Sequence, residues 1–469
     1  MRPYLRRIRT EKKLIFENFK GLYTSFGDEG CPEGFSPFMK NISALSYPNI
    51  KVRKGRREIC SLDGKILYFG VIEGKYLSCI EKKDGVCKWK YFDGEWKDIC
   101  TVPESDTGRY SMLYFLNATI LLTGKKEVVS GIEKSKSFAL TFENGVPKAK
   151  EEKNMPYCDM ADTIGGRLAV ASSEGDKIFL GGIMDRKVWF DISDGYEGSM
   201  ITQNCENITA IKVFGGHLVC FKGHSFGELY GNTPDTYTQI MVSDSMGCVA
   251  EKSIVDCGRL LWLSEEGIVS YGGGSLPKIL SRNVQKYIDN FDKERKEECS
   301  AGYDGIRYII SLPQKGGGKI NLVLNLESGM FFAEDERDFR FFANMGGVLY
   351  GADQSGRICI LWDENSEEKV AWEWESPVLG ADFFGKNNLH KIFVSGKFSG
   401  SVTIKIKNDK DCISESTLKI SEREETHRDT FSIKLHPALF TGKETFQIII
   451  SGEGKGEIFG VGIETRDRR

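Results

Sequence analysis

The sequence predicts an all-β protein: a β-propeller of about seven blades, with an extended N-terminal arm and a C-terminal β-sandwich. Three observations lead to this fold class. A short strand pattern repeats along the chain, 52 Gly accompany 29 Phe and 17 Tyr, and helical periodicity is scarce. Many glycines with many aromatic residues favour short strands joined by tight turns.

The repeat consists of a turn residue or Gly pair followed by a hydrophobic strand. The residues just before the seven strands are Gly64, Ala118, Gly166, Gly216, Gly258, Gly305 and Gly347, spaced 42 to 54 residues apart. Propeller blades repeat at about 40–50 residues. A blade cannot cover both of its faces alone, and packing blades around an axis buries those faces. Six or eight blades remain open, because the end repeats are the weakest.

The residues between these strands are mostly strand-like. Residues 88–100 read as two strands around Asp93-Gly94, and residues 320–335 as two strands around a turn at 327–329. Residues 283–299 predict one amphipathic helix between two blades, with Val284, Tyr287, Ile288 and Phe291 on one face. Residues 49–60 are a candidate for the outer strand that closes the ring.

The chain divides into three predicted parts. Residues 1–59 form an extended basic arm, 60–367 the propeller and 368–469 the sandwich. The sandwich rests on alternating strands with turn signals between them. These strands are 391–398, 401–408, 417–424, 429–435, 445–452 and 457–466.

Charge and cysteine content narrow the class further. The net charge is −3, but residues 1–60 hold 13 Lys and Arg against 6 Asp and Glu, a local balance of +7. The 13 Cys form no C-x-x-C pair, and Cys220 and Cys359 sit in apolar runs. We therefore expect free thiols that pack as small hydrophobes in a reducing compartment. We expect neither a signal peptide nor a membrane span, because no apolar run of the required length is present.

The basic arm is the main candidate for binding. Its two clusters comprise Arg2, Arg6, Arg7 and Arg9, with Lys12 and Lys13, and then Lys51, Arg53, Lys54, Arg56 and Arg57. Such clusters neutralise phosphates and bind nucleic acid independently of its sequence. They also suit an acidic protein surface. The alternative is a solvated tail and a charged edge strand that discourages aggregation.

No pattern in the sequence predicts catalysis, a metal site or a cofactor. The five His form no H-E-x-x-H motif, and no G-x-S-x-G elbow occurs. The Gly-rich run at 452–462 follows a strand but precedes no helix, so we expect a turn there, not a phosphate loop. Asp335-Glu336 and Asp409-Lys410-Asp411 lie in turn-like polar stretches, where we expect solvated carboxylates.

Three regions of the chain resemble a known family. Phe19-Lys20-Gly21-Leu22, Met39-Lys40-Asn41 and Val52-Arg53-Lys54-Gly55 resemble the opening of tailed-bacteriophage virion β-propeller proteins. Residues 246–288 are similar to a blade of those proteins that precedes a short helix, and residues 372–396 to the passage into their C-terminal β-domain. The family includes head–tail connector, packaged-DNA stabilisation and tail-nozzle components.

The resemblance implies a non-enzymatic structural protein of the virion, assembled in the cytoplasm of the bacterial host. The implied partners are portal, adaptor or tail proteins and packaged DNA, with copies arranged as a homo-oligomeric ring. The alternative is a propeller glycan-binding protein or glycosidase with a β-sandwich accessory domain. Propellers bind ligands at the axial mouth, where loops of all blades converge. That alternative predicts polar and aromatic groups, including two close carboxylates, at the axis.

Overall fold

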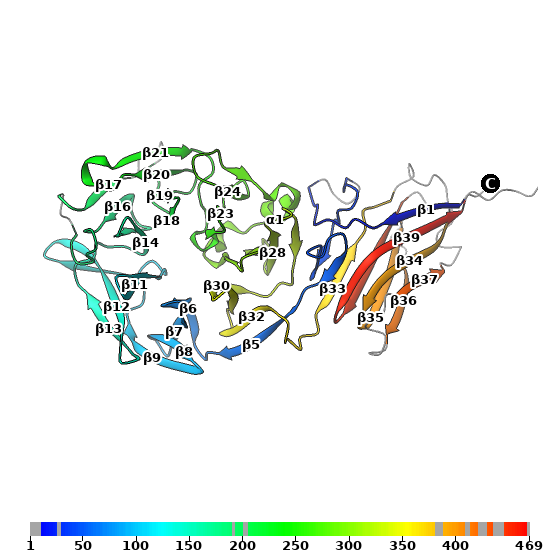
Figure 1. Ribbon diagram of the computed structural model, residues 1–469, viewed down its shortest axis with the longest axis horizontal. Coiled ribbons are helices and arrows are strands. Elements are labelled where there is room, and N and C mark those ends of the chain that lie inside the picture. The colour runs from blue at the N-terminus through cyan, green and yellow to red at the C-terminus, as the bar shows by residue number, and fades with distance from the viewer. Residues whose placement is uncertain are drawn as a thin grey trace, which may run out of the picture.

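The computed structural model describes residues 11–25, 30–189, 193–199, 205–379, 388–408, 413–420, 429–434 and 445–466. Within these residues a seven-bladed propeller lies beside a β-sandwich, and the N-terminal strands run between them (Figure 1). The predicted all-β fold class is confirmed.

Each blade is a four-stranded antiparallel sheet, and its four strands follow one another in order from the axis to the rim (Figure 1). The first blade consists of β6 (Lys65–Ile72), β7 (Tyr76–Lys83), β8 (Val86–Asp93) and β9 (Glu95–Val102), and the second of β10 (Ser111–Phe115), β11 (Ala118–Val129), β12 (Ile132–Glu143) and β13 (Val146–Glu152). The third consists of β14 (Met160–Ile164), β15 (Arg167–Ala171), β16 (Lys177–Leu180) and β17 (Tyr196–Ser199), and the fourth of β18 (Ala210–Phe214), β19 (His217–Phe221), β20 (Phe226–Tyr230) and β21 (Thr238–Ser243). The fifth consists of β22 (Val255–Asp256), β23 (Leu260–Leu263), β24 (Ile268–Tyr271) and β25 (Lys278–Ile279), and the sixth of β26 (Ser300–Tyr303), β27 (Arg307–Pro313), β28 (Lys319–Asn325) and β29 (Phe331–Ala333).

The seventh blade joins the two ends of the ring. It consists of β30 (Phe339–Met345), β31 (Val348–Asp353) and β32 (Arg357–Asp363), and its outer strand is β5 (Gly55–Ser61) from the N-terminal part of the chain. The prediction that residues 49–60 hold the closing strand is confirmed.

Burial explains the strand pattern that repeats along the sequence. Strands such as β23 are buried on both faces and are therefore continuously apolar, and β15 is apolar after its first residue, Arg167. The rim strand β13 has no fully buried residue and reads as polar. Both hairpins predicted at 88–100 and 320–335 are present, as β8–β9 and β28–β29.

Six of the seven repeat positions mark the second strand of a blade. Gly166, Gly216 and Gly347, for example, adopt φ values of 75°, 84° and 83° in the turn before that strand, a region that favours glycine. Gly64 instead precedes β6, the first strand of its blade. The first interval is the longest for this reason, because it measures from a first strand to a second strand.

The insertion before the sixth blade differs from the predicted single helix. Residues 281–298 form η3 (Ser281–Val284), α1 (Gln285–Asp289) and η4 (Lys293–Glu298). Val284, Ile288 and Phe291 are buried as expected. However, Phe291 pairs with Gln314 and the Asp292 amide donates to the Pro313 carbonyl, so the chain leaves the helical path at this point.

The N-terminal strands connect the propeller to the sandwich. β2 (Met39–Lys40) lies between β29 of the sixth blade and β33 (Ala371–Glu375), which makes one continuous nine-stranded sheet. The other sandwich strands are β1 (Glu11–Phe16), β3 (Ile42–Ser43), β4 (Ile50–Val52), β34 (Asn388–Phe398), β35 (Gly400–Asn408), β36 (Ile413–Ile420), β37 (Asp429–Lys434), β38 (Phe446–Glu453) and β39 (Gly456–Arg466). The ends of the predicted strands 417–424 and 429–435 lie outside the described residues.

One hydrophobic core runs from the fifth and sixth blades into the sandwich. Trp374 is buried in it, and the Phe19 ring packs edge-on against Trp374 with centroids 5.4 Å apart. All cysteines in the described part of the chain are free thiols, and Cys220 and Cys359 are fully buried as predicted. No helix in that part is long and apolar enough to cross a membrane.

Candidate functional site

The predicted basic residues occupy very different environments. Arg2, Arg6, Arg7 and Arg9 lie outside the described residues. Lys51, Lys54 and Arg57 are exposed on or beside the strands that leave the sandwich for the propeller. Lys54 pairs with Glu364, and Arg57 pairs with Asp363. Arg53 and Arg56 are buried.

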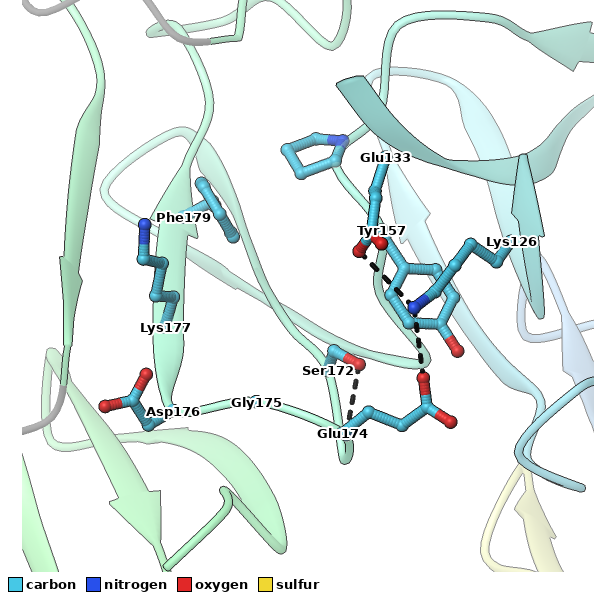
Figure 2. A pocket seen from close by; sticks show the side chains of 10 residues that line it. Lys126, Glu133, Tyr157, Ser172, Glu174, Gly175, Asp176, Lys177 and Phe179 are labelled. Carbon is cyan, nitrogen blue, oxygen red and sulfur yellow. Dashed lines mark hydrogen bonds and ion pairs between the residues drawn. The ribbon is translucent and has the colours of Figure 1, made fainter. Parts of the chain in front are cut away.

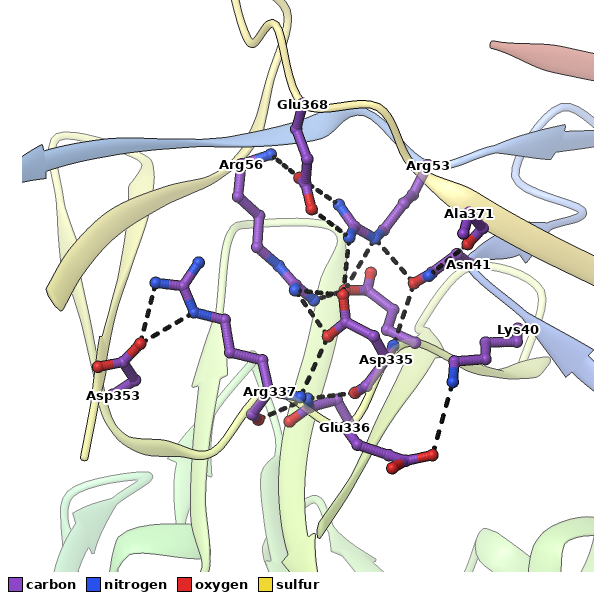
Figure 3. A network of polar contacts seen from close by, with 12 residues as sticks. Lys40, Asn41, Arg53, Arg56, Asp335, Glu336, Arg337, Asp353, Glu368 and Ala371 are labelled. Atoms are coloured by element: carbon purple, nitrogen blue, oxygen red, sulfur yellow. Dashed lines mark hydrogen bonds and ion pairs between the residues drawn. The ribbon is translucent and has the colours of Figure 1, made fainter. Parts of the chain in front are cut away.

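Arg53 holds together the arm, the sixth blade and the segment before β33. Its Nε donates to Asn41 Oδ1 at 2.9 Å, and its Nη2 donates to Asp335 Oδ2 at 2.9 Å and to Glu368 Oε1 at 3.0 Å (Figure 3). Asn41 also donates to the Ala371 carbonyl at 2.8 Å. The contacts with Asp335 and Glu368 join chain segments that are about 300 residues apart in the sequence.

Arg56 is enclosed still more completely. Its Nη1 donates to Asp335 Oδ2 at 2.6 Å and its Nη2 to Glu334 Oε2 at 2.6 Å, while Trp362 donates to the other Glu334 oxygen. Burial alone would lower the pKa of Arg56, but Glu334 and Asp335 raise it above its usual value. Burial would raise the pKa of Asp335, but Arg56 and Arg53 hold it at about 2.

These contacts correct two expectations from the sequence. Arg53 and Arg56 face carboxylates inside the chain, so they are not presented to a nucleic acid or a partner. Asp335 is not a solvated turn residue, because it binds both guanidiniums, whereas Glu336 is exposed as expected. Asp409 and Asp411 lie outside the described residues. Lys51, Lys54 and Arg57 remain open to a partner.

A second polar cluster lies at the axis, at the start of the inner strands. Arg109, just before β10, donates from Nη1 to the Thr209 carbonyl at 3.0 Å. The same Nη1 lies 3.4 Å from Glu251 Oε2, and Nη2 lies 3.1 Å from Glu297 Oε1. These residues belong to the second, fourth and fifth blades and to the segment that leads into the sixth. One guanidinium therefore binds two carboxylates across the axial mouth.

The axial cluster contains groups with shifted pKa values. Burial raises the pKa of Glu251 to about 7, against the opposing charge of Arg109. Burial lowers the pKa of Lys252, whose ammonium lies 4.5 Å from the centroid of the Phe341 ring. Burial also raises the pKa of Tyr68, and the Glu251 charge adds to this shift. A carboxyl group that titrates near neutral pH can hold or release a proton there.

A surface cavity of about 310 Å³ opens between the second and third blades (Figure 2). The Lys126 ammonium lies 3.3 Å from Glu133 Oε2, 3.4 Å from Glu174 Oε2 and 4.4 Å from the centroid of the Tyr157 ring. Burial, together with Glu174, raises the pKa of Tyr157, so its hydroxyl stays protonated. This set can bind a polar ligand, but it lacks a free nucleophile beside a base.

In the part of the chain that the structure describes, no three His, Cys, Asp or Glu side chains are grouped so that they could hold a metal ion. Sequence reasoning missed Arg109, Glu251 and Glu297, because the three residues come from segments that are far apart in the sequence and share no motif. The only signal was positional: a charged residue just before the first strand of a blade faces the axis.

Comparisons with known proteins identify no family. No protein-family model and no curated protein matches the sequence. A streptogramin B lyase structure matches with 10% identity and a TM-score of 0.43, covering 66% of this chain and 97% of its own. BamB from Moraxella catarrhalis matches with 11% identity and a TM-score of 0.38, covering 70% of this chain and 95% of its own. Likeness at this level does not bear on function.

Proposed function

We propose that this chain is a structural, non-catalytic protein of a tailed-bacteriophage virion, a head–tail connector or tail component that docks on portal, adaptor or other tail proteins. The observation that carries the proposal is the way the N-terminal strands fasten two β-domains into one body. The motif resemblance at the start, middle and end of the chain supplies the phage context.

The junction between the propeller and the sandwich consists of β2, β33 and the buried contacts of Arg53 and Arg56. These elements hold the two domains in a fixed geometry. The nine-stranded sheet crosses the junction without a break, and one hydrophobic core lies beneath. The buried charges of Arg53 and Arg56 are matched by carboxylates from both sides of the junction. Removing one partner of such a group leaves an uncompensated buried charge, so the two domains resist separation. A component of a particle that must keep its shape under mechanical force needs this resistance more than it needs a hinge.

Partners in this proposal are other virion proteins, further copies in a homo-oligomeric ring, and packaged DNA. The groups for acidic partners are Arg2, Arg6, Arg7 and Arg9, joined by the exposed Lys51, Lys54 and Arg57. Assembly takes place in the cytoplasm of the bacterial host.

Mass spectrometry of purified particles tests the proposal. We expect the chain at a fixed copy number in intact virions, and electron microscopy of the purified protein should show rings. A strictly monomeric chain that is absent from particles would overturn the proposal. DNA binding is measured separately, with full-length chain and a variant lacking residues 1–10 at several salt concentrations, because phosphate contacts weaken as salt rises.

A second candidate is favoured by the axial cluster: a glycan-binding protein or glycosidase. Glycoside hydrolysis uses two carboxyl groups, one of which is protonated near neutral pH. Glu251 and Glu297 share one guanidinium, and Glu251 has the raised pKa. A hydrolysis screen on bacterial surface glycans tests this candidate. Activity that Glu251→Gln abolishes would establish it, and no activity on any glycan would reject hydrolysis.

A further inference from the structure

The cavity between the second and third blades belongs to neither of the two proposed functions. The outer ends of β11 and β12 form one wall of it, and the turn between β15 and β16 forms another (Figure 2). β11 and β12 have 12 residues each, and β11 is fully buried only as far as Gly124, so the rest of the hairpin projects beyond the core of its blade. The cavity volume, about 310 Å³, is at the lower end of the usual range for small-molecule sites.

Two glutamates keep hydrogen-bond acceptors open at this cavity. Glu133 belongs to β12 and Glu174 to the turn after β15, and each contacts Lys126 Nζ through Oε2, at 3.3 Å and 3.4 Å. Neither carboxylate has another ion pair within the described residues, and their side chains are 58% and 50% exposed. Because a carboxylate can accept about four hydrogen bonds, both can bind hydroxyl groups of a ligand while they hold Lys126.

Tyr157 adds a hydrogen-bond donor beside these acceptors. The residue is only 7% exposed, and the centroid of its ring lies 4.4 Å from the Lys126 ammonium. Its hydroxyl is close to Glu174 but forms no hydrogen bond of normal geometry in the part of the chain that the structure describes. Buried polar groups usually have a partner, and an oxygen atom of a ligand beside Glu174 would supply one.

The charges around the cavity favour a neutral ligand with many hydroxyl groups. Lys126 and Lys177 repel a cation, and Glu133, Glu174 and Asp176 repel an anion. An apolar molecule would bury these polar groups without hydrogen bonds, which is costly. A sugar ring avoids each of these costs, because its hydroxyl groups donate to the carboxylates and accept from the ammonium group. Its C–H face packs against the apolar side chains of the wall.

A second cavity adjoins the first, which suits a chain of sugars more than a single one. Its volume is about 530 Å³, and it shares Lys177 and Phe179 with the first cavity. Trp189 and Tyr196 line it, among others. Ligand sites in proteins combine aromatic surfaces with a few polar groups that fix the orientation of the ligand. Two adjoining cavities of this kind can hold several sugar rings in a row.

We propose that the cavity between the second and third blades binds a neutral glycan. One sugar donates hydroxyl hydrogen bonds to Glu133 and Glu174 and accepts from Lys126, and the next sugars extend toward the second cavity. The site shares no residue with the axial cluster of Arg109, Glu251 and Glu297. Binding here requires neither a place in the virion nor hydrolysis at the axis, so it goes beyond both proposed functions.

An array of neutral, anionic and cationic polysaccharides, probed with the full chain, tests this site. We expect retention on neutral polysaccharides, and a tetrasaccharide of the best-bound one is then used for calorimetry and hydrogen exchange. It should protect amides of residues 126–133 and 172–177. Glu133→Ala with Glu174→Ala should weaken its binding about tenfold or more, because hydrogen bonds to charged groups are the stronger ones. Tyr157→Phe keeps the ring beside Lys126 and should weaken binding about threefold.

A matched control is Glu127→Ala with Glu143→Ala, which removes the same charge from β11 and β12 outside the cavity. Both residues have a single lysine partner or a pair of them on the blade surface, and the control should bind as the parent chain does. Three outcomes would overturn the proposal: no retention on any neutral polysaccharide, equal losses in the two double variants, or protection confined to other blades. Preferential binding of polycations would also overturn it, since it would indicate a cation site.

The glycan site and the proposed functions fail independently. A chain that is present in virions but binds no glycan would overturn the site and leave the structural function intact. A chain that binds the tetrasaccharide but is absent from virions would overturn the structural function and leave the site intact. Binding that Glu133→Ala with Glu174→Ala weakens and Glu251→Gln leaves unchanged would support this cavity over the axial cluster as the site.

Discussion

Two arginines in this molecule each hold two carboxylates, but their surroundings differ. At the junction, the Arg56 side chain is 2% exposed, and its partners Glu334 and Asp335 are 6% and 26% exposed. At the axial mouth, Arg109 is 14% exposed, and Glu251 and Glu297 are 29% and 59% exposed. The junction is a closed network that holds chain segments together. The axial cluster is more open to solvent.

The acids of the two clusters respond in opposite ways. Asp335 receives two guanidiniums, and their charges overcome burial and hold its pKa at about 2. Glu251 shares one guanidinium with Glu297, and burial overcomes that charge and raises its pKa to about 7. The number of compensating charges, more than burial itself, decides whether a carboxyl group here is a structural anion or a proton donor.

The largest effect is expected when Arg56 is replaced by alanine. The substitution leaves Glu334 and part of Asp335 buried without their partner, which typically costs about 3–5 kcal/mol. We expect the free energy of unfolding in urea to fall by that amount.

Arg57→Ala is the control for this substitution. Arg57 directly follows Arg56 in the sequence, but its side chain is exposed and forms an ion pair with Asp363 alone. Exposed pairs contribute about 0–1 kcal/mol. Equal losses for the two variants would mean that the closed network adds no stability and that the contrast drawn above is wrong.

The second effect concerns two asparagines with the same backbone geometry. Asn41 and Asn117 both have φ of 58°, so replacement by alanine strains both alike. Asn41 is buried, donates to Ala371 and accepts from Arg53, whereas exposed Asn117 has one long contact with Tyr114. Leaving buried groups without partners costs about 1–3 kcal/mol. We expect Asn41→Ala to lose about 2 kcal/mol more than Asn117→Ala in thermal or urea unfolding; equal losses would contradict this.

Acid should weaken the junction through Asp335. Its pKa in the folded chain is about 2, below the ordinary value of 3.8, so the stability it contributes is present above pH 4 and is lost as pH falls through 2. The shift corresponds to about 2 kcal/mol. Urea unfolding between pH 5 and pH 2 measures the loss, and Asp335→Asn should flatten that part of the curve. An unchanged slope in the variant would show that Asp335 does not carry the effect.

Much of the fold could be predicted because most blades are built from strands that follow one another in the sequence. A Gly turn followed by an apolar strand marks the second strand of a blade at most of the repeat positions, as at Gly216 and Gly347, although Gly64 precedes a first strand. The helix at 283–299 could not be predicted in full, because its amphipathic face is real but Phe291 pairs with Gln314 from a later hairpin. Hydrophobic periodicity indicates which residues of one segment are buried. It does not show that a second segment pairs with the backbone of the first and so ends the helix.

The sites could be predicted far less well. The sequence showed Arg53 and Arg56 as part of a basic run, but it could not show that Glu334, Asp335 and Glu368 would enclose them from about 300 residues away. In the same way, Arg109 meets its carboxylates only because a ring brings distant segments to one axis. Charge pairing of this kind depends on topology, and composition alone favours the solvent-exposed interpretation.

The smallest effect is expected at the axial mouth, and its sign is opposite to that of the junction. Glu251 has a folded pKa of about 7, above its ordinary value of 4.5, so its contribution to stability is full below pH 4.5 and is lost as pH rises through 7. Because Glu251 is partly solvated, we expect a loss of about 1 kcal/mol between pH 5 and pH 8 in urea unfolding. Glu251→Gln should remove this loss, since an amide does not titrate. Glu297→Gln keeps the Arg109 contact in reach and should retain the loss, moved slightly to lower pH, because the Glu297 charge contributes to the raised pKa of Glu251. If Glu251→Gln shows the same pH dependence as the parent chain, the carboxyl group is ionised throughout, and the axial cluster is a second structural network instead of a site that can donate a proton.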